Sequence, residues 1–405
     1  MPRYLVFDDG LGSLAPLTDL RASFDVRTGA CTTLERIVAE LGTDGALVVP
    51  QPLAATTRER HTMPVNPDLS GHPAVLALNG RAPLGITLAP SLVARAAILE
   101  AGTGHLIAGN IPGSHASSLA RGASGVIRDV VTGTLDGGHL LSRPWHWRTF
   151  RDRALAHDLA RLAAGPPSAH PPGVVVFGAH PLRIDPAARV CPCATLDLEK
   201  GPIVVAAHAV IRPGAVLVGP CFIGEHSTIA DRAVMRPNTA VGPWCKVGGE
   251  VAGTIFQGFS NKSHDGYLGD SWVGEWVNLG AGTNNSNLLN TYGEVKARAT
   301  PGGPEVPTGE TFLGAIIGDH AKAAIGTRIM TGAVIHTGAM LATTGFTSGC
   351  VAPFAWRTDG GDSVWRLDRF METARAMMGR RQTEASAAYS DRIRELHRAA
   401  SAPAR

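Results

Sequence analysis

From Val205 to Val247 of this 405-residue chain, an aliphatic residue or Met recurs at every sixth position. A small residue, or Val at the last step, follows each of them four positions later. A helix buries the same face about every 3.6 residues and a strand about every 2, so neither explains this period. The period predicts a parallel β-helix of hexapeptide repeats, in which each coil has three short sides and buries its inward residues on the next coil.

The aliphatic column comprises Val205, Ile211, Leu217, Ile223, Ile229, Met235, Val241 and Val247, and the small column comprises Ala209, Ala215, Cys221, Ser227, Ala233, Thr239, Cys245 and Val251. The pattern begins upstream at Ile184, and an offset of three residues before Val205 predicts a short loop insertion. It fails between Val251 and Leu268 and again between Thr283 and Ile317. Departures from a strong local pattern are where function is expected. The period alone leaves an enzyme, a scaffold and a surface protein open.

Composition excludes several classes of partner. A formal net charge of +3 is too small to indicate nucleic acid or a membrane surface as a partner. The first ten residues show no secretory pattern and no apolar run reaches transmembrane length, so we expect a cytoplasmic protein. Cys221 and Cys245 stand at inward positions and are expected to be core thiols. Cys191 and Cys193 lack a second pair or a His at zinc spacing, which argues against a zinc site.

The chain divides into an α/β domain (1–165), a Pro- and Gly-rich linker (166–183), the β-helix (184–350) and a C-terminal helical extension (351–405). Alternating strands and helices predict the fold class of the first part. The predicted strands are 4–7 and 46–49, and the predicted helices are 32–41, capped by Thr32 or Thr33, 92–100, 147–164, and 363–400, capped by Asp362 or Ser363.

Polar residues fill both interruptions of the repeat. The first contains Asn261, Lys262 and His264, and the second runs Asn284-Asn285-Ser286-Asn287. Such side chains could hydrogen-bond a polyhydroxylated or phosphorylated ligand. A solvated Asn-rich turn is the alternative, because Asn tolerates left-handed backbone angles. Taken alone, His264 also fits an ordinary loop residue.

Two motifs give a family resemblance. Gly-Tyr-Leu-Gly-Asp at 266–270 and Val-Asn-Leu-Gly-Ala-Gly-Thr at 277–283 resemble the acetyltransferase half of the bifunctional N-acetylglucosamine-1-phosphate uridylyltransferase/glucosamine-1-phosphate N-acetyltransferase. The resemblance implies a left-handed coil, an exception to the usual right-handed crossover. It also implies acetyl-CoA as cosubstrate, an amino-sugar phosphate as acceptor, and a homotrimer whose sites lie between subunits.

The resemblance also assigns residues. His264 matches the general base, whose imidazole is suited to accept a proton near neutral pH. Asn287, or the backbone N–H of Ala281 next to the acetyl-CoA thioester, could stabilise the oxyanion. The residues matched to sugar or phosphate binding are Arg236, Tyr267, Asn278 and Asn287, and Lys262 and Lys296 are further candidates to hold a phosphate.

A second resemblance is closer and spans nearly the whole chain. A group of proteins described as sugar nucleotidyltransferases carries the segments found here at 242–250, 260–266, 284–288 and 292–296. The N-terminal segments 16–18, 27–29 and 79–81 also fit that group. This resemblance implies that the N-terminal domain acts on a sugar nucleotide.

The expected nucleotide loop is degenerate. The segment Asp8-Asp9-Gly10-Leu11-Gly12 follows the first strand, but neither Thr-Arg nor Pro-Lys follows it. Gly10, Gly12, Arg21 and Arg27 are the candidates to bind nucleotide phosphates, with surface ion pairing of the arginines as the alternative. Asp8 and Asp9 could hold Mg²⁺ or simply end the strand in a turn, so the metal ligands stay unassigned.

Three functions therefore remain open. The chain could combine the acetyltransferase with a UDP-N-acetylglucosamine diphosphorylase, which would use UTP and Mg²⁺. It could be an acyltransferase with a non-catalytic N-terminal domain. It could also be a β-helix scaffold without catalysis, although His264, Asn278 and Asn287 argue against that.

Overall fold

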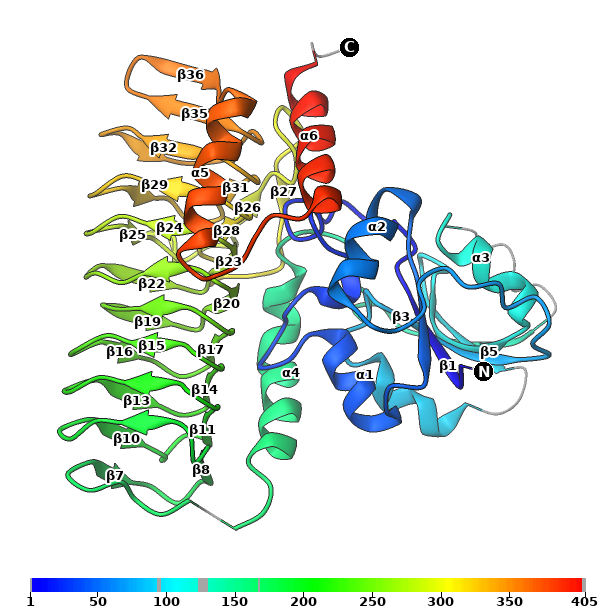
Figure 1. Cartoon of the computed structure of the whole chain (residues 1–405), viewed down its shortest axis with the longest axis horizontal. Helices are drawn as coiled ribbons and strands as arrows, with labels where there is room; N and C mark the ends of the chain where they lie inside the picture. Colours follow the sequence, from blue (N-terminus) through cyan, green and yellow to red (C-terminus); the bar gives the residue numbers. More distant parts are fainter. Residues whose placement is uncertain (1, 93–95, 123–129, 167, 403–405) are drawn as a thin grey trace. The chain divides into compact units, whose positions relative to one another are not determined.

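The computed structural model describes residues 2–92, 96–122, 130–166 and 168–402. The chain forms two compact units (Figure 1). The first unit comprises Met1–Val26, Cys31–Pro144 and Ser386–Ile393, and the second comprises Arg27–Ala30, Trp145–Ala385 and Arg394–Arg405.

The first unit is built on a six-stranded sheet with strand order β2-β1-β3-β5-β4-β6. β1 runs parallel to β2 and β3, whereas β5 runs antiparallel to β3 and β4. Apolar clusters line both faces of the sheet, as expected for an α/β domain. The elements are β1 (Tyr4–Phe7), η1 (Ser23–Asp25), α1 (Thr33–Leu41), β2 (Gly45–Val48), α2 (Gln51–Arg60), β3 (Val75–Asn79), η2 (Gly85–Ser91), β4 (Ala96–Glu100), β5 (Leu106–Ile111), η3 (Gly113–His115), α3 (Ala116–Leu119) and β6 (Val131–Leu135).

The sequence predicted the helix α1 correctly, but it predicted a helix where the structure has the strand β4. The Thr32 side chain accepts a hydrogen bond from the Glu35 N–H, and the Glu35 carboxylate accepts one from the Thr32 N–H, which confirms the predicted helix start. The helix predicted over 92–100 is wrong. Its last five residues form β4, paired with β5 and β6, because sheet pairing overrides the helix propensity of an Ala-rich segment. Residues 93–95 lie outside the described part of the chain.

The second unit contains the parallel β-helix, whose coils have three walls (Figure 1). The first wall comprises β7 (Val175–Phe177), β10 (Thr195–Asp197), β13 (Val216–Val218), β16 (Val234–Met235), β19 (Glu250–Ala252) and β22 (Tyr267–Gly269), followed by β25 (Asn284–Asn285), β30 (Arg328–Ile329) and β33 (Phe346–Thr347). The second comprises β8 (Leu182–Ile184), β11 (Ile203–Val205), β14 (Cys221–Ile223), β17 (Thr239–Val241), β20 (Ile255–Gly258), β23 (Trp272–Glu275), β28 (Ile316–Ile317), β31 (Val334–Ile335) and β34 (Cys350–Val351). The third comprises β9 (Arg189–Val190), β12 (Val210–Ile211), β15 (Thr228–Ile229), β18 (Lys246–Val247), β21 (Asn261–Lys262), β24 (Asn278–Leu279), β29 (Lys322–Ala323), β32 (Met340–Ala342) and β35 (Ala355–Thr358), with β36 (Gly361–Val364) antiparallel to β35.

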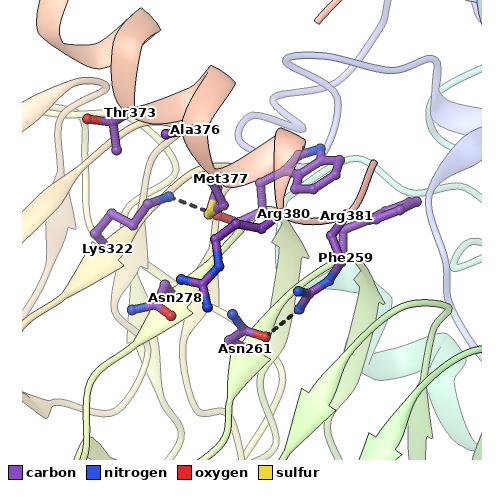
Figure 2. A pocket seen from close by; sticks show the side chains of 10 residues that line it. Phe259, Asn261, Asn278, Lys322, Thr373, Ala376, Met377, Arg380 and Arg381 are labelled. Atoms are coloured by element: carbon purple, nitrogen blue, oxygen red, sulfur yellow. Dashed lines mark hydrogen bonds between the residues drawn. The ribbon is translucent and has the colours of Figure 1, made fainter. Parts of the chain in front are cut away.

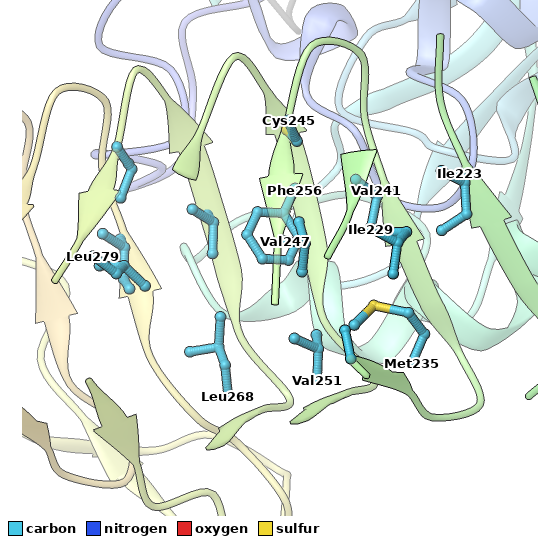
Figure 3. Close-up of a cluster of buried hydrophobic side chains, with 14 of the residues drawn as sticks. Ile223, Ile229, Met235, Val241, Cys245, Val247, Val251, Phe256, Leu268 and Leu279 are labelled. Atoms are coloured by element: carbon cyan, nitrogen blue, oxygen red, sulfur yellow. The ribbon is translucent and has the colours of Figure 1, made fainter. Parts of the chain in front are cut away.

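The predicted columns form the core of this β-helix (Figure 3). Ile223 pairs with Val241 in the next coil, so one coil spans three hexapeptides. All members of the aliphatic column are at most 1% exposed, and all members of the small column are fully buried. Burial raises the pKa of Cys221 and of Cys245 to about 12, which confirms both as core thiols. The offset before Val205 is a loop, because Leu196 pairs with Leu217 at a separation larger than a coil.

One corner of the coil carries a column of rings that the hexapeptide pattern did not predict. His208, His226, Trp244, Phe259, Trp276 and His320 all have φ between 55° and 61°. Consecutive ring centroids lie 4.7, 4.2, 6.4, 4.5 and 6.4 Å apart with the rings nearly parallel. A left-handed backbone costs a non-glycine residue about 1 kcal/mol, and an aromatic pair returns about 0.5–1.5 kcal/mol. Stacking therefore offsets the cost of the sharp corner.

The C-terminal region differs from the single helix predicted over 363–400. β36 ends at Val364, and two helices follow, α5 (Leu367–Gly379) and α6 (Ala387–Ser401). The residue preceding α5 is Arg366, not Asp362 or Ser363, because these two residues pair in the β35–β36 hairpin. α5 buries Phe370, Met371, Ala374 and Met378.

Two further results concern the connection between the units. The predicted helix 147–164 is α4 (His146–Leu162), and it groups with the β-helix unit, not with the sheet of the first unit. Pairing of the walls begins at β7, within the predicted linker. Of the helices in the described ranges, none combines the length and apolarity needed to cross a membrane.

Candidate functional site

Three of the predicted site residues, Arg236, Tyr267 and Asn287, come together on the outer side of the first wall. Arg236 directly follows β16 and its Nε lies 2.8 Å from Glu250 Oε1 of β19. Tyr267 pairs with Glu250 in register, and its hydroxyl accepts a hydrogen bond from Asn287 Nδ2 at 3.2 Å. Burial, with the charges of Asp270 and Glu250, raises the pKa of Tyr267, while Asn287 and Arg236 oppose the rise. The phenol is therefore neutral and can donate a hydrogen bond.

Asp270 anchors this cluster, although the sequence analysis gave it no role. Its Oδ2 accepts a hydrogen bond from Asn287 Nδ2 at 2.8 Å, and its Oδ1 accepts one from Arg151 Nη1 of α4 at 2.6 Å. The Nε of Arg148, one helical turn earlier, lies 3.1 Å from the same oxygen. Two arginines thus balance the carboxylate that orients the Asn287 amide. The Asp of the Tyr-Leu-Gly-Asp motif was the available signal, but its two arginine partners lie over a hundred residues away.

His264 and Ala281 occupy the same corner of consecutive coils. His264 lies in the turn between β21 and β22, and Ala281 lies in the turn between β24 and β25. The two turns are joined by the Gly282 N–H, which donates to the Asp265 carbonyl at 3.0 Å. Both residues are exposed. The corner that follows the third wall and precedes the first therefore presents the predicted base and the predicted thioester contact together.

Lys262 does not fit its predicted role as a phosphate ligand. It pairs in register with Val247, so its side chain points into the core, where it is 1% exposed. Its Nζ donates hydrogen bonds to the carbonyls of Gly248, His264 and Gly266 at 3.0, 3.1 and 2.7 Å. All three donors of the ammonium are used. Lys262 thus ties the turn that carries His264 to the core.

Asn284 and Asn285 extend the first wall across the second interruption. Asn284 Oδ1 accepts a hydrogen bond from the Tyr267 N–H, and Asn285 Oδ1 accepts one from the Gly269 N–H, each at 2.7 Å. Asn285 Nδ2 also donates to the Gly269 carbonyl at 2.9 Å. These amides replace backbone pairing, which gives both side chains a structural role. Of this Asn-rich segment, only Asn287 faces the cluster.

Asn278 lies apart from this cluster, on the third wall. It lines a cavity of about 290 Å³ under the C-terminal end of α5, together with Asn261, Lys322 and Arg380 (Figure 2). Lys296 is also separate. It is exposed in the hairpin formed by β26 (Lys296–Ala297) and β27 (Val306–Pro307) and lines a different cavity of about 560 Å³.

The N-terminal loop satisfies its own carboxylates. Asp8 accepts hydrogen bonds from the N–H groups of Gly10 and Ser23, and burial raises the pKa of Asp8. Asp9 accepts two from Arg81, at 2.7 and 2.6 Å. Burial raises the pKa of Asp9, but the hydrogen bonds and charge of Arg81 outweigh it and lower the pKa overall. The strand-ending turn is confirmed, because both carboxylates accept hydrogen bonds from protein groups.

The remaining nucleotide candidates divide into two pairs. Gly10 and Gly12 are exposed, with φ of 66° and 85°. Arg21 and Arg27 are 2% and 5% exposed, so both side chains are buried and do not lie on the surface. Arg21 donates to the Leu17 carbonyl, and Arg27 groups with the β-helix unit, where its N–H donates to Gln257. Within the described ranges, no three His, Cys, Asp or Glu side chains gather as a metal site.

Residues 4–166 match the sugar nucleotidyl transferase family. The chain is 35% identical over 138 residues to a bifunctional sugar-1-phosphate nucleotidylyltransferase/acetyltransferase of Sulfurisphaera tokodaii, which covers 34% of each chain. It is also 35% identical over 142 residues to the bifunctional protein GlmU of Corynebacterium glutamicum strain R, covering 33% of this chain and 28% of that protein. The chain thus matches about a third or less of the length of these relatives.

Among solved structures, a UDP-N-acetylglucosamine acyltransferase of Francisella novicida is similar to 55% of this chain and 76% of its own, with 13% identity and a TM-score of 0.24. The strand pairing described above, and not this likeness, establishes the β-helix.

Replacing Asp270 by Asn should lower the free energy of unfolding by about 3 kcal/mol, because the change leaves Arg151 buried beside a neutral side chain. Urea denaturation measures this effect. Asp152→Asn is the matched control, because its carboxylate pairs with the same arginines but is 51% exposed, and its loss should cost less than about 1 kcal/mol. Equal costs for the two variants would contradict the assigned anchoring role.

Lys262 should give stability a pH dependence. Burial lowers the pKa of Lys262 to about 8, although Asp265 raises it, whereas an unfolded lysine has a pKa near about 10.4. The unfolded chain therefore binds more protons between these values, and stability from this group rises with pH across that window. The free energy of unfolding of the wild type minus that of Lys262→Met should increase from pH 8 to 10. If this difference in the free energy of unfolding does not change with pH, the Lys262 ammonium is in contact with solvent in the folded protein.

Proposed function

We propose that the β-helix transfers an acyl group from acetyl-CoA to the amino group of an amino-sugar phosphate similar to glucosamine 1-phosphate. The observation that carries this proposal is the position of the cluster of Arg236, Tyr267 and Asn287. It lies on the wall that begins directly after the corner carrying His264 and Ala281. A base, a thioester contact and a polar binding surface therefore adjoin one another.

The reaction joins nitrogen to the acyl carbon and breaks the thioester. The acceptor amine must be neutral to attack, and its nitrogen loses a proton as the new N–C bond forms. His264 accepts that proton, since the unprotonated ring nitrogen of an imidazole is suited to act as a general base. The carbonyl oxygen becomes negative during the attack, and the N–H of Ala281 stabilises it, because both N–H donors of the Asn287 amide are used by Tyr267 and Asp270. The sulfur then leaves with the electrons of the C–S bond, and the thiolate takes up a proton.

The first-wall cluster would hold the sugar phosphate. The exposed guanidinium of Arg236 is suited to a phosphate, because its planar fork can donate two parallel hydrogen bonds. Glu250 pairs with this arginine in the absence of substrate, and a phosphate would compete for it. Tyr267 supplies a donor, its phenol O–H, and Asn287 supplies an acceptor, its Oδ1, for the sugar hydroxyls. Lys296 remains a candidate for a second phosphate contact.

The proposal includes the homotrimer that the family resemblance implies. Asn278 lies on the third wall, whereas the other predicted sugar contacts lie on the first wall. One sugar could contact both sets if a neighbouring copy supplied one of them. A monomer would then be inactive.

For the N-terminal unit we propose nucleotidyl transfer from UTP to N-acetylglucosamine 1-phosphate, which releases pyrophosphate. The family match over residues 4–166 supports it. A non-catalytic N-terminal unit is the second candidate. It is favoured by one observation, namely that Asp8 and Asp9 accept hydrogen bonds from Gly10, Ser23 and Arg81 of the same unit. No step through Mg²⁺ is assigned to these residues.

Replacing His264 by Ala should reduce kcat for acetyl transfer by about 10²–10⁴, the usual contribution of a general base. The assay incubates the protein with acetyl-CoA and glucosamine 1-phosphate and follows free thiol. Ser263→Ala, in the same turn, is the control and should keep most of the activity. A nearly unchanged kcat in a folded His264→Ala protein would exclude this base. The absence of thiol release by the wild type across several amino-sugar phosphates would favour the scaffold.

Replacing Gly12 by Ala should abolish pyrophosphate release from UTP and N-acetylglucosamine 1-phosphate. A Cβ at this position would lie 3.1 Å from the Ser142 backbone and displace the loop. Gly102→Ala is the matched control, because it has a similar φ of 82° but open space around its Cβ. Release that survives in Gly12→Ala would exclude the loop from nucleotide binding, and no release by the wild type would support a non-catalytic unit.

A further inference from the structure

The cavity under α5 collects positive charge. Lys322 of the third wall and Arg380 and Arg381 after the end of α5 line it, and its lining includes no Asp or Glu (Figure 2). Like charges that share a cavity repel one another, and a bound anion relieves that repulsion. The third wall adds the side chain of Asn261, whose Nδ2 can donate a hydrogen bond to an anion.

Each cation is held differently. Lys322 Nζ donates to the carbonyls of Trp276 and His320 at 2.9 Å each, which leaves its third donor for a ligand. Burial lowers the pKa of Lys322 to about 7, and the cavity lining includes no carboxylate that would oppose this effect. Arg381 Nη2 donates to Asn261 Oδ1 at 2.8 Å, which fixes its direction. Arg380 is exposed, and its side chain makes no hydrogen bond or ion pair with any described residue.

The helix end does not explain this arrangement. Cations beside a helix C-terminus interact favourably with the helix dipole, which could account for Arg380 and Arg381. It does not account for Lys322, which comes from a strand of the β-helix and whose ammonium is partly withdrawn from water. Interaction with the helix dipole alone would therefore explain the two arginines, but not the lysine and the two asparagine amides that line the same cavity.

Two residues that line the cavity are close in sequence to the corner that carries His264 and Ala281. Asn261 lies three residues before His264, and Asn278 lies three residues before Ala281. Three residues of extended chain span about 10 Å. The corner therefore has a polar surface on each side. The first wall carries Arg236, and the third wall carries the three cations of the cavity.

We propose that this cavity binds a phosphate group of the acyl donor. This rests on the proposed function, in which both substrates are phosphorylated and Arg236 holds the phosphate of the sugar. Coenzyme A carries a ribose phosphate and a diphosphate at the end of a flexible arm. With those phosphates beside Lys322 and Arg380, the arm runs along the third wall and brings the thioester to Ala281.

The test measures binding without turnover. Isothermal titration gives the Kd of coenzyme A for the wild-type protein, for Arg380→Ala, and for Arg375→Ala. Arg375 is an exposed arginine of α5 that does not line the cavity. Loss of a charged hydrogen bond should weaken binding in Arg380→Ala about tenfold or more. Arg375→Ala should leave the Kd within about twofold, because surface charges act weakly at a distance.

Two further ligands identify the source of the phosphate. Pantetheine lacks the phosphates, so its Kd should be the same for wild type and Arg380→Ala. Glucosamine 1-phosphate should also bind both proteins equally. The proposal is overturned if Arg380→Ala leaves the Kd of coenzyme A unchanged, if both arginine variants weaken it equally, or if only glucosamine 1-phosphate binding is lost.

These experiments distinguish a loss of coenzyme A binding from a loss of acyl transfer. His264→Ala should bind coenzyme A with the wild-type Kd even if it transfers no acyl group. A protein that binds coenzyme A through Arg380 but acylates no amino sugar would keep the cavity assignment and remove the proposed acceptor. Thermal unfolding of each variant checks that the exposed substitutions leave the fold intact.

Discussion

Each coil of the β-helix is covered only by the coil next to it, so the inward side chains must fit one another at a fixed register. A coil of three hexapeptides gives that register, and it is kept where Ile223 meets Val241 and where Val273 meets Ile317 across a long insertion. An inward polar group would lose water without gaining a partner, at a cost of about 1–3 kcal/mol. The constraint therefore moves variation to outward positions, corners and insertions, and these are the places that remain for binding and catalysis.

The first interruption of the repeat satisfies the same constraint with different atoms. Lys262 takes an inward position, and three carbonyls accept hydrogen bonds from its ammonium. Because one of those carbonyls belongs to His264, the polar substitution that breaks the apolar pattern also fixes the turn that carries the proposed base. Asn285 acts similarly in the next coil, where its amide replaces backbone pairing with Gly269. The coil remains continuous although its sequence pattern does not.

This explains what the sequence could predict. A period of six follows from inward packing, which is local and repeated, so both columns and their burial were predictable from residues such as Leu217 and Ala215. The capping box of α1 was predictable for the same reason. Lys262 was misplaced because a lysine in a polar segment resembles a ligand unless the register is known. β4 was misassigned because pairing with β5 and β6 decides its state. The first-wall cluster came from the resemblance, and Asp270 was missed because its partners are distant in sequence.

The arginines of α4 give the first wall the charge that the proposed reaction needs. Asp270 holds the Asn287 amide, but an unpaired carboxylate there would repel a sugar phosphate and would raise the pKa of Tyr267 further. Arg151 and Arg148 neutralise it without using Arg236, which stays available to the phosphate. Yet α4 lies within residues 4–166, the region that matches the sugar nucleotidyl transferase family. A boundary drawn from that match would assign to the first unit a helix that groups with the β-helix. The acyl-transfer site we propose therefore depends on the last helix of the N-terminal family region.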